Sequence, residues 1–149
     1  MKHLLFTGLM LTVFIVHGQS TKHNKTMNST AIEVFQSFGE GMMSGTDVWK
    51  DYLADDINFI GPVDQVQGKE AFITLNESFM PMMRGSKMHQ IIEKDNWVIT
   101  QVAFDVAMPS GQTITLEMSE WYEIKDNQIQ SIKVYYDAEE FRKHLTPTK

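Results

Sequence analysis

The hydrophobic positions change their spacing at about residue 87. From 30 to 83, apolar residues recur every three or four positions around one short apolar run, which predicts helices and a single short strand. From 87 to 136, apolar and polar residues alternate, which predicts long strands joined by tight turns. This segregation predicts an α+β fold in which helices pack on one face of a curved, mostly antiparallel sheet.

The element boundaries are predicted by caps and turn residues. Thr30 and Glu33 form a capping box that begins the first helix, and Gly45 ends it. We expect further helices from 47, from 69 to about 81 and after 137, and strands at 57–60, 87–94, 97–108, 113–124 and 129–136.

The N-terminus has the three-part pattern of a secretory signal peptide. Lys2 precedes an apolar run at 4–16, and small residues follow it. We expect cleavage after Gly18, a flexible polar segment at 19–29 and one domain at 30–145. The mature protein is then secreted or periplasmic and has no membrane segment. The alternative is an uncleaved N-terminal anchor.

Composition narrows the possible partners and cofactors. The chain has no cysteine, so an exported domain must be held together by its core. The formal net charge is −6 and basic residues do not cluster with aromatic ones, which argues against nucleic acid as a partner. The five histidines show no ligand spacing with carboxylates, so neither a metal nor another cofactor is expected.

Two segments resemble the SnoaL-like domain of the NTF2-like superfamily. The first is WKDYLADDINFIGPVDQVQGKEAF at 49–72, and the second is WYEIKDNQIQSIKVYYDAEEF at 121–141. In that family a Y-L-A-D-D type helix end leads to a strand, a G-P turn and a G-K-E-A helix start, and the final hairpin ends in Y-x-D. The resemblance covers about 30–143 and implies a cone of three main helices on a strongly curved, mostly antiparallel sheet. It also implies a deep apolar pocket, and members are often dimers across the outer sheet face.

The resemblance implies several possible activities and argues against one. Members include ketosteroid isomerases, polyketide cyclases, epoxide hydrolases and domains without known activity. The steroid isomerases have an aspartate base just before the proline that follows the first strand, and a tyrosine on the first helix. Gly61 occupies the first position here, and no tyrosine occurs between Thr30 and Gly45, so steroid isomerisation is not expected.

Glu120 interrupts an otherwise apolar strand face. That face carries Ile114, Leu116, Met118, Tyr122 and Ile124. If the face lines a pocket, desolvation raises the pKa of Glu120 and suits it to general acid or base catalysis. Two alternatives stay open: a bulge before Glu120 would turn it outward, or it lies at a wet rim paired with a lysine.

Other site residues follow from the same strand faces. Tyr136 and Asp137 join Glu120 as catalytic candidates, although Asp137 also fits the N-cap of the last helix. The expected ligand contacts are Trp97, Val98, Phe104, Met118, Tyr122, Phe72, Phe79 and Met83. The predicted ligand is an apolar or aromatic small molecule.

Two functions are compatible with these residues. One is cofactor-independent acid–base catalysis of the isomerase, cyclase or hydratase type, and the other is a non-catalytic binding module.

The opposite sheet face carries several apolar residues, which predicts a homodimer. That face is represented by Ile99, Ala103, Asp105, Ala107 and Trp121.

Overall fold

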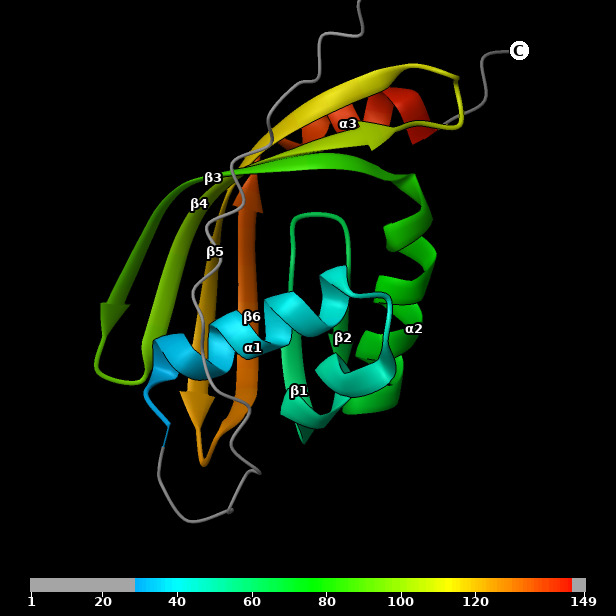
Figure 1. The fold of residues 1–149 in the computed structure, drawn as a ribbon. Coiled ribbons are helices and arrows are strands. Elements are labelled where there is room, and N and C mark those ends of the chain that lie inside the picture. The colour runs from blue at the N-terminus through cyan, green and yellow to red at the C-terminus, as the bar shows by residue number, and fades with distance from the viewer. Residues whose placement is uncertain (1–28, 146–149) are drawn as a thin grey trace, which may run out of the picture.

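A computed structural model describes residues 29–145, so the expected leader at 1–18 and the segment 19–28 lie outside it (Figure 1). The elements are α1 (Ala31–Met43), the 3-10 helix η1 (Asp47–Tyr52), β1 (Leu53–Ile60), β2 (Gln65–Gln67), α2 (Lys69–Phe79), η2 (Met80–Met82), β3 (Met83–Lys94), β4 (Trp97–Ala107), β5 (Thr113–Lys125), β6 (Gln128–Tyr136) and α3 (Ala138–Leu145). Within the described range, no helix is long and apolar enough to cross a membrane.

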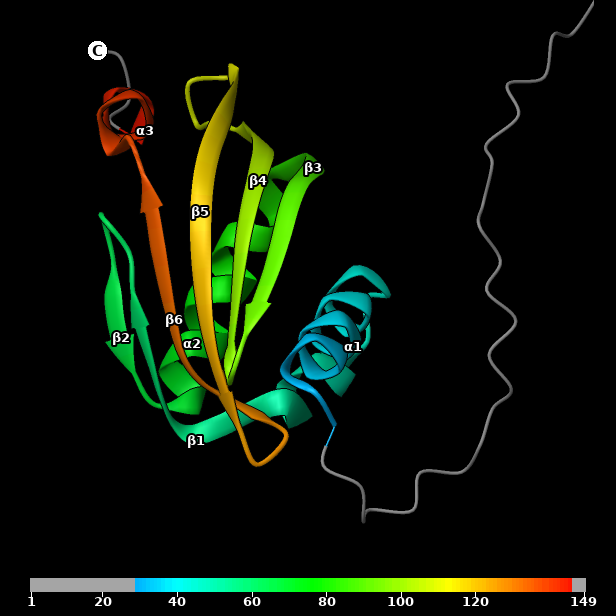
Figure 2. The ribbon, with the colours of Figure 1, turned by 90° about the vertical axis from the view of Figure 1, so that its left-hand side faces the viewer.

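The strands form one mixed, open sheet. Its order is β2-β1-β6-β5-β4-β3, and every neighbouring pair is antiparallel except β1 and β6, which are parallel. Strands β3 to β5 bend strongly, and α2 lies inside the bend behind them in Figure 2. Helix α1 packs across β4, β5 and β6 (Figure 1). The predicted α+β fold with a mostly antiparallel sheet is confirmed.

The predicted capping box and C-terminal glycine of α1 are both present. The Thr30 hydroxyl accepts a hydrogen bond from the Glu33 amide at 3.4 Å, and the Glu33 carboxylate accepts one from the Thr30 amide at 2.9 Å. Gly45 has φ 68°, the left-handed conformation that commonly follows a helix end. Val34, Phe35 and Phe38 are buried and attach the helix to the sheet.

The hairpins β3–β4 and β5–β6 have turns at the predicted positions, although β3 begins at Met83 rather than at residue 87. Asp95 has φ 55° in the turn between β3 and β4. Asp126 and Asn127 have φ 52° and 60° in the turn between β5 and β6, as a primed two-residue turn requires. In the sheet, Glu120 of β5 pairs with Thr100 of β4 on one side and with Val134 of β6 on the other.

The first strand differs from the prediction. It begins at Leu53 rather than at residue 57, and it contains the exposed Asp55 and Asp56. The burial pattern of β1 does not alternate, because its pairing with β6 shifts register between Leu53 and Asn58. Strand β2 was not predicted, since three residues are too few to show a period.

Candidate functional site

A cavity of about 190 Å³ lies between the inner sheet face and the helices. Its walls come from α1 and α2, from the inner faces of β4, β5 and β6, from the turn between β1 and β2, and from α3. The cavity borders both hydrophobic clusters of the core, since Phe38 and Phe72 belong to one and Leu116 and Phe141 to the other.

Glu120 lies in the wall of this cavity. The pairing of β4 with β5 is unbroken along its length and sets Glu120 opposite Thr100, so no bulge turns the side chain outward. The flanking Met118 and Tyr122 are buried on the same face. Among the described residues, no lysine pairs with Glu120.

Two hydroxyls hold one oxygen of this carboxylate. Tyr122 donates to Glu120 Oε2 at 2.9 Å, and Thr100 donates to the same atom at 3.3 Å. No hydrogen bond from a described residue reaches Oε1. In the described part of the chain, every fully buried side-chain oxygen has a hydrogen-bond partner. Because Oε1 has none, it is not fully buried and is accessible to solvent. Glu120 thus lines the cavity with one carboxylate oxygen held by hydroxyls and the other without a partner among the described residues.

Burial governs the protonation of this pair. It raises the pKa of Glu120, and the hydrogen bonds from Tyr122 and Thr100 partly oppose that rise. Burial and the neighbouring Glu120 raise the pKa of Tyr122 well above its usual value of 10.0. Tyr122 therefore acts as a hydrogen-bond donor, whereas Glu120 is the group that gains and loses a proton.

The other two catalytic candidates differ in position. Tyr136 lines the cavity, and burial and the nearby Asp64 raise the pKa of its hydroxyl, while Arg142 opposes the rise. Asp137 is exposed and does not line the cavity. Its carboxylate accepts a hydrogen bond from the Glu139 amide at 2.9 Å, so it caps α3. The N-cap role that the sequence offered for Asp137 is therefore confirmed, and this residue lies outside the cavity lining.

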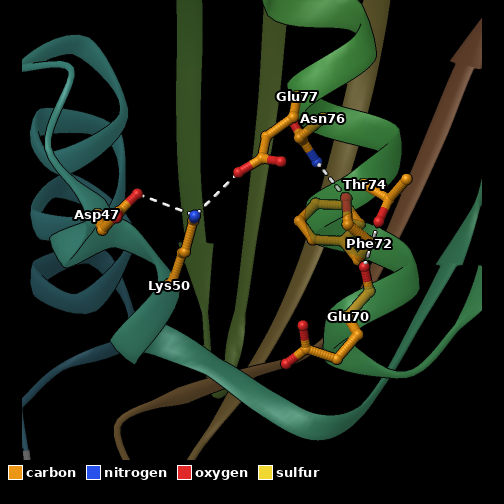
Figure 3. A network of polar contacts seen from close by, with 7 residues as sticks. All are labelled: Asp47, Lys50, Glu70, Phe72, Thr74, Asn76 and Glu77. Atoms are coloured by element: carbon orange, nitrogen blue, oxygen red, sulfur yellow. Dashed lines mark hydrogen bonds and ion pairs between the residues drawn. The ribbon is translucent and has the colours of Figure 1, made fainter.

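Polar contacts connect the two helical walls (Figure 3). Lys50 on η1 lies 2.9 Å from Asp47 Oδ1 and 2.9 Å from Glu77 Oε1 on α2. Next to Glu77, the side-chain amide of Asn76 donates to the Phe72 carbonyl one turn earlier in α2 at 3.3 Å, and both residues line the cavity. The Lys50–Glu77 pair therefore links η1 to α2, whereas the Asn76 hydrogen bond lies within α2.

Comparison with known proteins agrees with this architecture. The sequence profile described as SnoaL-like domain matches residues 31–132. The chain belongs to the SnoaL-like domain family. Among the curated proteins, none matches significantly.

Solved structures show the same fold as this SnoaL-like domain. An NTF2-like protein of unknown function from Cytophaga hutchinsonii has 19% identity over 78% of this chain and 98% of its own, with a TM-score of 0.65. A putative SnoaL-like polyketide cyclase from Mesorhizobium loti has 22% identity over 72% of this chain and 100% of its own, with a TM-score of 0.62. TerC, co-crystallised with polyporic acid, has 15% identity over 78% of this chain and 98% of its own, with a TM-score of 0.66.

Most of the expected ligand contacts of this SnoaL-like domain line the cavity. They are Phe72, Phe79, Met83, Phe104, Met118 and Tyr122. Trp97 and Val98 do not. Val98 faces inward but is fully buried in the core cluster beneath α1. Trp97 lies on the opposite face, where its ring packs edge-on against Trp121 at 6.5 Å.

Three polar residues of the site were not anticipated from the sequence. Asp64 lines the cavity from the turn before β2, Asn76 lines it from α2, and Thr100 supports Glu120 from β4. Asn76 carried a signal, since it lies four residues after Phe72 and three before Phe79 on the apolar stripe. No group of three metal-ligating side chains occurs within residues 29–145.

Proposed function

We propose that this SnoaL-like domain is a cofactor-independent acid–base catalyst for a small apolar molecule. The proposal rests on the different surroundings of the two Glu120 oxygens. Two hydroxyls donate to Oε2, whereas Oε1 is free toward the partly aromatic cavity. A carboxylate in such surroundings has a raised pKa and exchanges protons closer to neutral pH than an exposed one.

The proposal assigns a role to each polar neighbour. Glu120 removes or returns a proton on the ligand. Tyr122 and Thr100 fix the carboxylate, and fixed orientation is what makes a weak base effective. The Tyr136 hydroxyl, which no described residue holds, is a donor for a ligand oxygen that gains charge. Isomerisation, cyclisation and hydration all use such a pair, and similar folds carry the names polyketide cyclase and isomerase.

A non-catalytic binding module is the alternative function. It is favoured by the contact between Tyr122 and Glu120, because that contact occupies the hydroxyl nearest to the carboxylate. In this alternative the same carboxylate orients a ligand without changing it.

Ring opening of 5-nitrobenzisoxazole tests the proposal, because it requires only that a base remove one carbon-bound proton. We expect the wild-type rate to exceed that of buffer and to rise with pH as Glu120 ionises. Glu120→Gln should lower the rate by about a hundredfold or more. Glu117→Gln is the matched control, since Glu117 lies on the same strand but is exposed on its outer face.

The outcomes separate the two functions. Equal rates in wild type and Glu120→Gln would show that Glu120 is not the base. Saturable binding of the probe without ring opening would favour the binding module.

A further inference from the structure

The cavity wall carries negative charge and no positive charge. Within the described part of the chain, the lining contains two carboxylates, Glu120 and Asp64, and no lysine, arginine or histidine. Asn76 donates from its nitrogen to the Phe72 carbonyl at 3.3 Å (Figure 3), and no hydrogen bond from a described residue reaches its oxygen. A ligand that enters this cavity therefore meets two carboxylates and no positive charge, and the Tyr136 hydroxyl is the donor left for a neutral oxygen.

The rest of the wall combines aromatic rings with aliphatic and methionine side chains. Six phenylalanines and two tyrosines contribute to the lining. Aromatic faces attract cations through the negative potential above the ring, and the attraction strengthens where water is excluded. Rings of this kind around a carboxylate form the surroundings in which proteins hold organic ammonium groups.

We propose that the cavity binds a small protonated amine whose ammonium group lies at Glu120 Oε1 and whose apolar body fills the aromatic part. This inference rests on the proposed function in one respect only, that the ligand occupies this cavity beside Glu120. It goes further by assigning the charge and size of the ligand.

Charge favours an amine over an anion. An ionised Glu120 has hydroxyl donors but no positive partner among the described residues, and a bound ammonium group supplies one. A carboxylate ligand would add a second negative charge in the same desolvated space. Arg142 does not offset this, because it is exposed on α3, outside the lining, and donates to the Pro62 carbonyl at 2.7 Å.

The volume limits the apolar body. A cavity of about 190 Å³ is only slightly larger than an engineered apolar cavity of about 150 Å³ that accommodates benzene. One six-membered ring with a short polar arm fills this space, whereas a fused system of several rings exceeds it.

Three ligands of nearly equal shape test the inference: benzylamine, benzyl alcohol and benzoate. Calorimetric titration near neutral pH should give benzylamine at least about tenfold tighter binding than benzyl alcohol and no detectable binding of benzoate. Glu120→Gln should abolish the preference for the amine while benzyl alcohol still binds, which also shows that the variant is folded. Glu117→Gln should retain the preference.

The pH dependence adds a second readout. Benzylamine affinity should fall as the solution is acidified, because protonated Glu120 offers no charge. Tyr122 and Tyr136 do not produce this loss, because the pKa of each hydroxyl is raised and both remain neutral as the pH falls. Arg142 lies outside the lining, and the contribution of Asp64, the other carboxylate of the lining, is tested by its own variant. Asp64→Asn should keep the fall.

Four results would overturn the inference. They are equal affinity for amine and alcohol in wild type, tighter binding of benzoate, an amine preference that survives Glu120→Gln, and no binding of any of the three. None of these decides the ring-opening assay, which uses an uncharged probe and tests the proposed function by itself.

Discussion

Tyr122 and Glu120 lie two positions apart on β5, so their side chains share the inner sheet face, and the Tyr122 hydroxyl donates to Glu120 Oε2 at 2.9 Å. The ring of Tyr122 also packs edge-on against Phe35 at 4.9 Å between ring centroids. One side chain thus joins the carboxylate to the core beneath α1. The orientation of Glu120 consequently depends on the packing of the first helix.

Removing the Tyr122 hydroxyl should raise the pKa of Glu120 further. The hydrogen bond stabilises the ionised carboxylate, and Tyr122→Phe deletes it while the ring remains. A carboxyl titration followed by carbon NMR measures the change. Thr100→Val should raise the pKa less, because Thr100 makes the longer hydrogen bond at 3.3 Å. A lower pKa in Tyr122→Phe would contradict the assigned role of the hydroxyl.

Glu120→Gln should change the dependence of stability on pH. The folded-state pKa of Glu120 lies above its ordinary value of 4.5, so wild-type stability is fully present below that value and is lost as the pH rises through the folded pKa. Glutamine keeps an acceptor for both hydroxyls and cannot ionise. The variant should therefore be more stable at neutral pH, by about 1–3 kcal/mol.

Urea unfolding at several pH values measures this difference. It should shrink as the pH falls below 4.5, where the wild-type carboxyl becomes protonated in both the folded and the unfolded state. Glu117→Gln on the exposed face should show no comparable dependence. A variant less stable than wild type at neutral pH would indicate that the ionised carboxylate is stabilised by a contact other than the two hydroxyls.

The sequence predicts the inner face of β5 well because strand alternation is strict there. Glu120 falls between Met118 and Tyr122, and the unbroken pairing with β4 preserves the alternation. The role of Thr100 was not predictable in the same way, because it depends on the register between two strands rather than on one strand. That register follows from the turn between β4 and β5, whose length the pattern gives only approximately.

The extent of the cavity was harder to predict than its wall. Val98 has the correct orientation for a lining residue, but α1 covers that end of β4 and converts the position into core. Asp64 enters the site through a turn before a three-residue strand that shows no period. Packing between distant segments decides which part of a sheet the helices cover. The local pattern of apolar residues does not predict this.

Gly41 permits the close contact between α1 and η1. A Cβ atom at this position would lie 2.8 Å from the Trp49 backbone nitrogen. Gly41→Ala should therefore destabilise the domain by about 1–3 kcal/mol, since one of the two elements must shift. Gly39→Ala is the matched control: it meets nothing within 4 Å in the same helix and should stabilise by about 0.5–1 kcal/mol. Urea unfolding of both variants checks the opposite signs.

The N-terminal pattern predicts processing. We propose that the chain is exported and cleaved after Gly18, which gives a mature protein beginning at Gln19. Expression of the full chain in a host with a secretory pathway, followed by intact-mass measurement, checks the cleavage site. Gly18→Trp should block cleavage because the site requires small residues. A full-length product in wild type would support the uncleaved anchor instead.

We propose a homodimer through the outer sheet face. On this face Trp121 is 40% and Tyr135 57% exposed, and the Trp121 ring packs edge-on between Trp97 at 6.5 Å and Tyr135 at 6.4 Å. Ala103 is only 8% exposed in the single chain, so it adds little apolar surface to a contact between two chains. The continuous aromatic surface is therefore centred on Trp121, and apolar surface of this kind gains free energy when a partner covers it.

Sedimentation equilibrium measures the assembly. We expect a dimer at about 20 µM and at least tenfold weaker association in Trp121→Lys, because a lysine at the centre of the contact must be desolvated against its symmetry mate, at a cost of about 1.4 kcal/mol or more. Val48→Lys is the control, since Val48 is 52% exposed on η1, away from this face. A monomeric wild type at this concentration would mean that the outer face remains exposed to water.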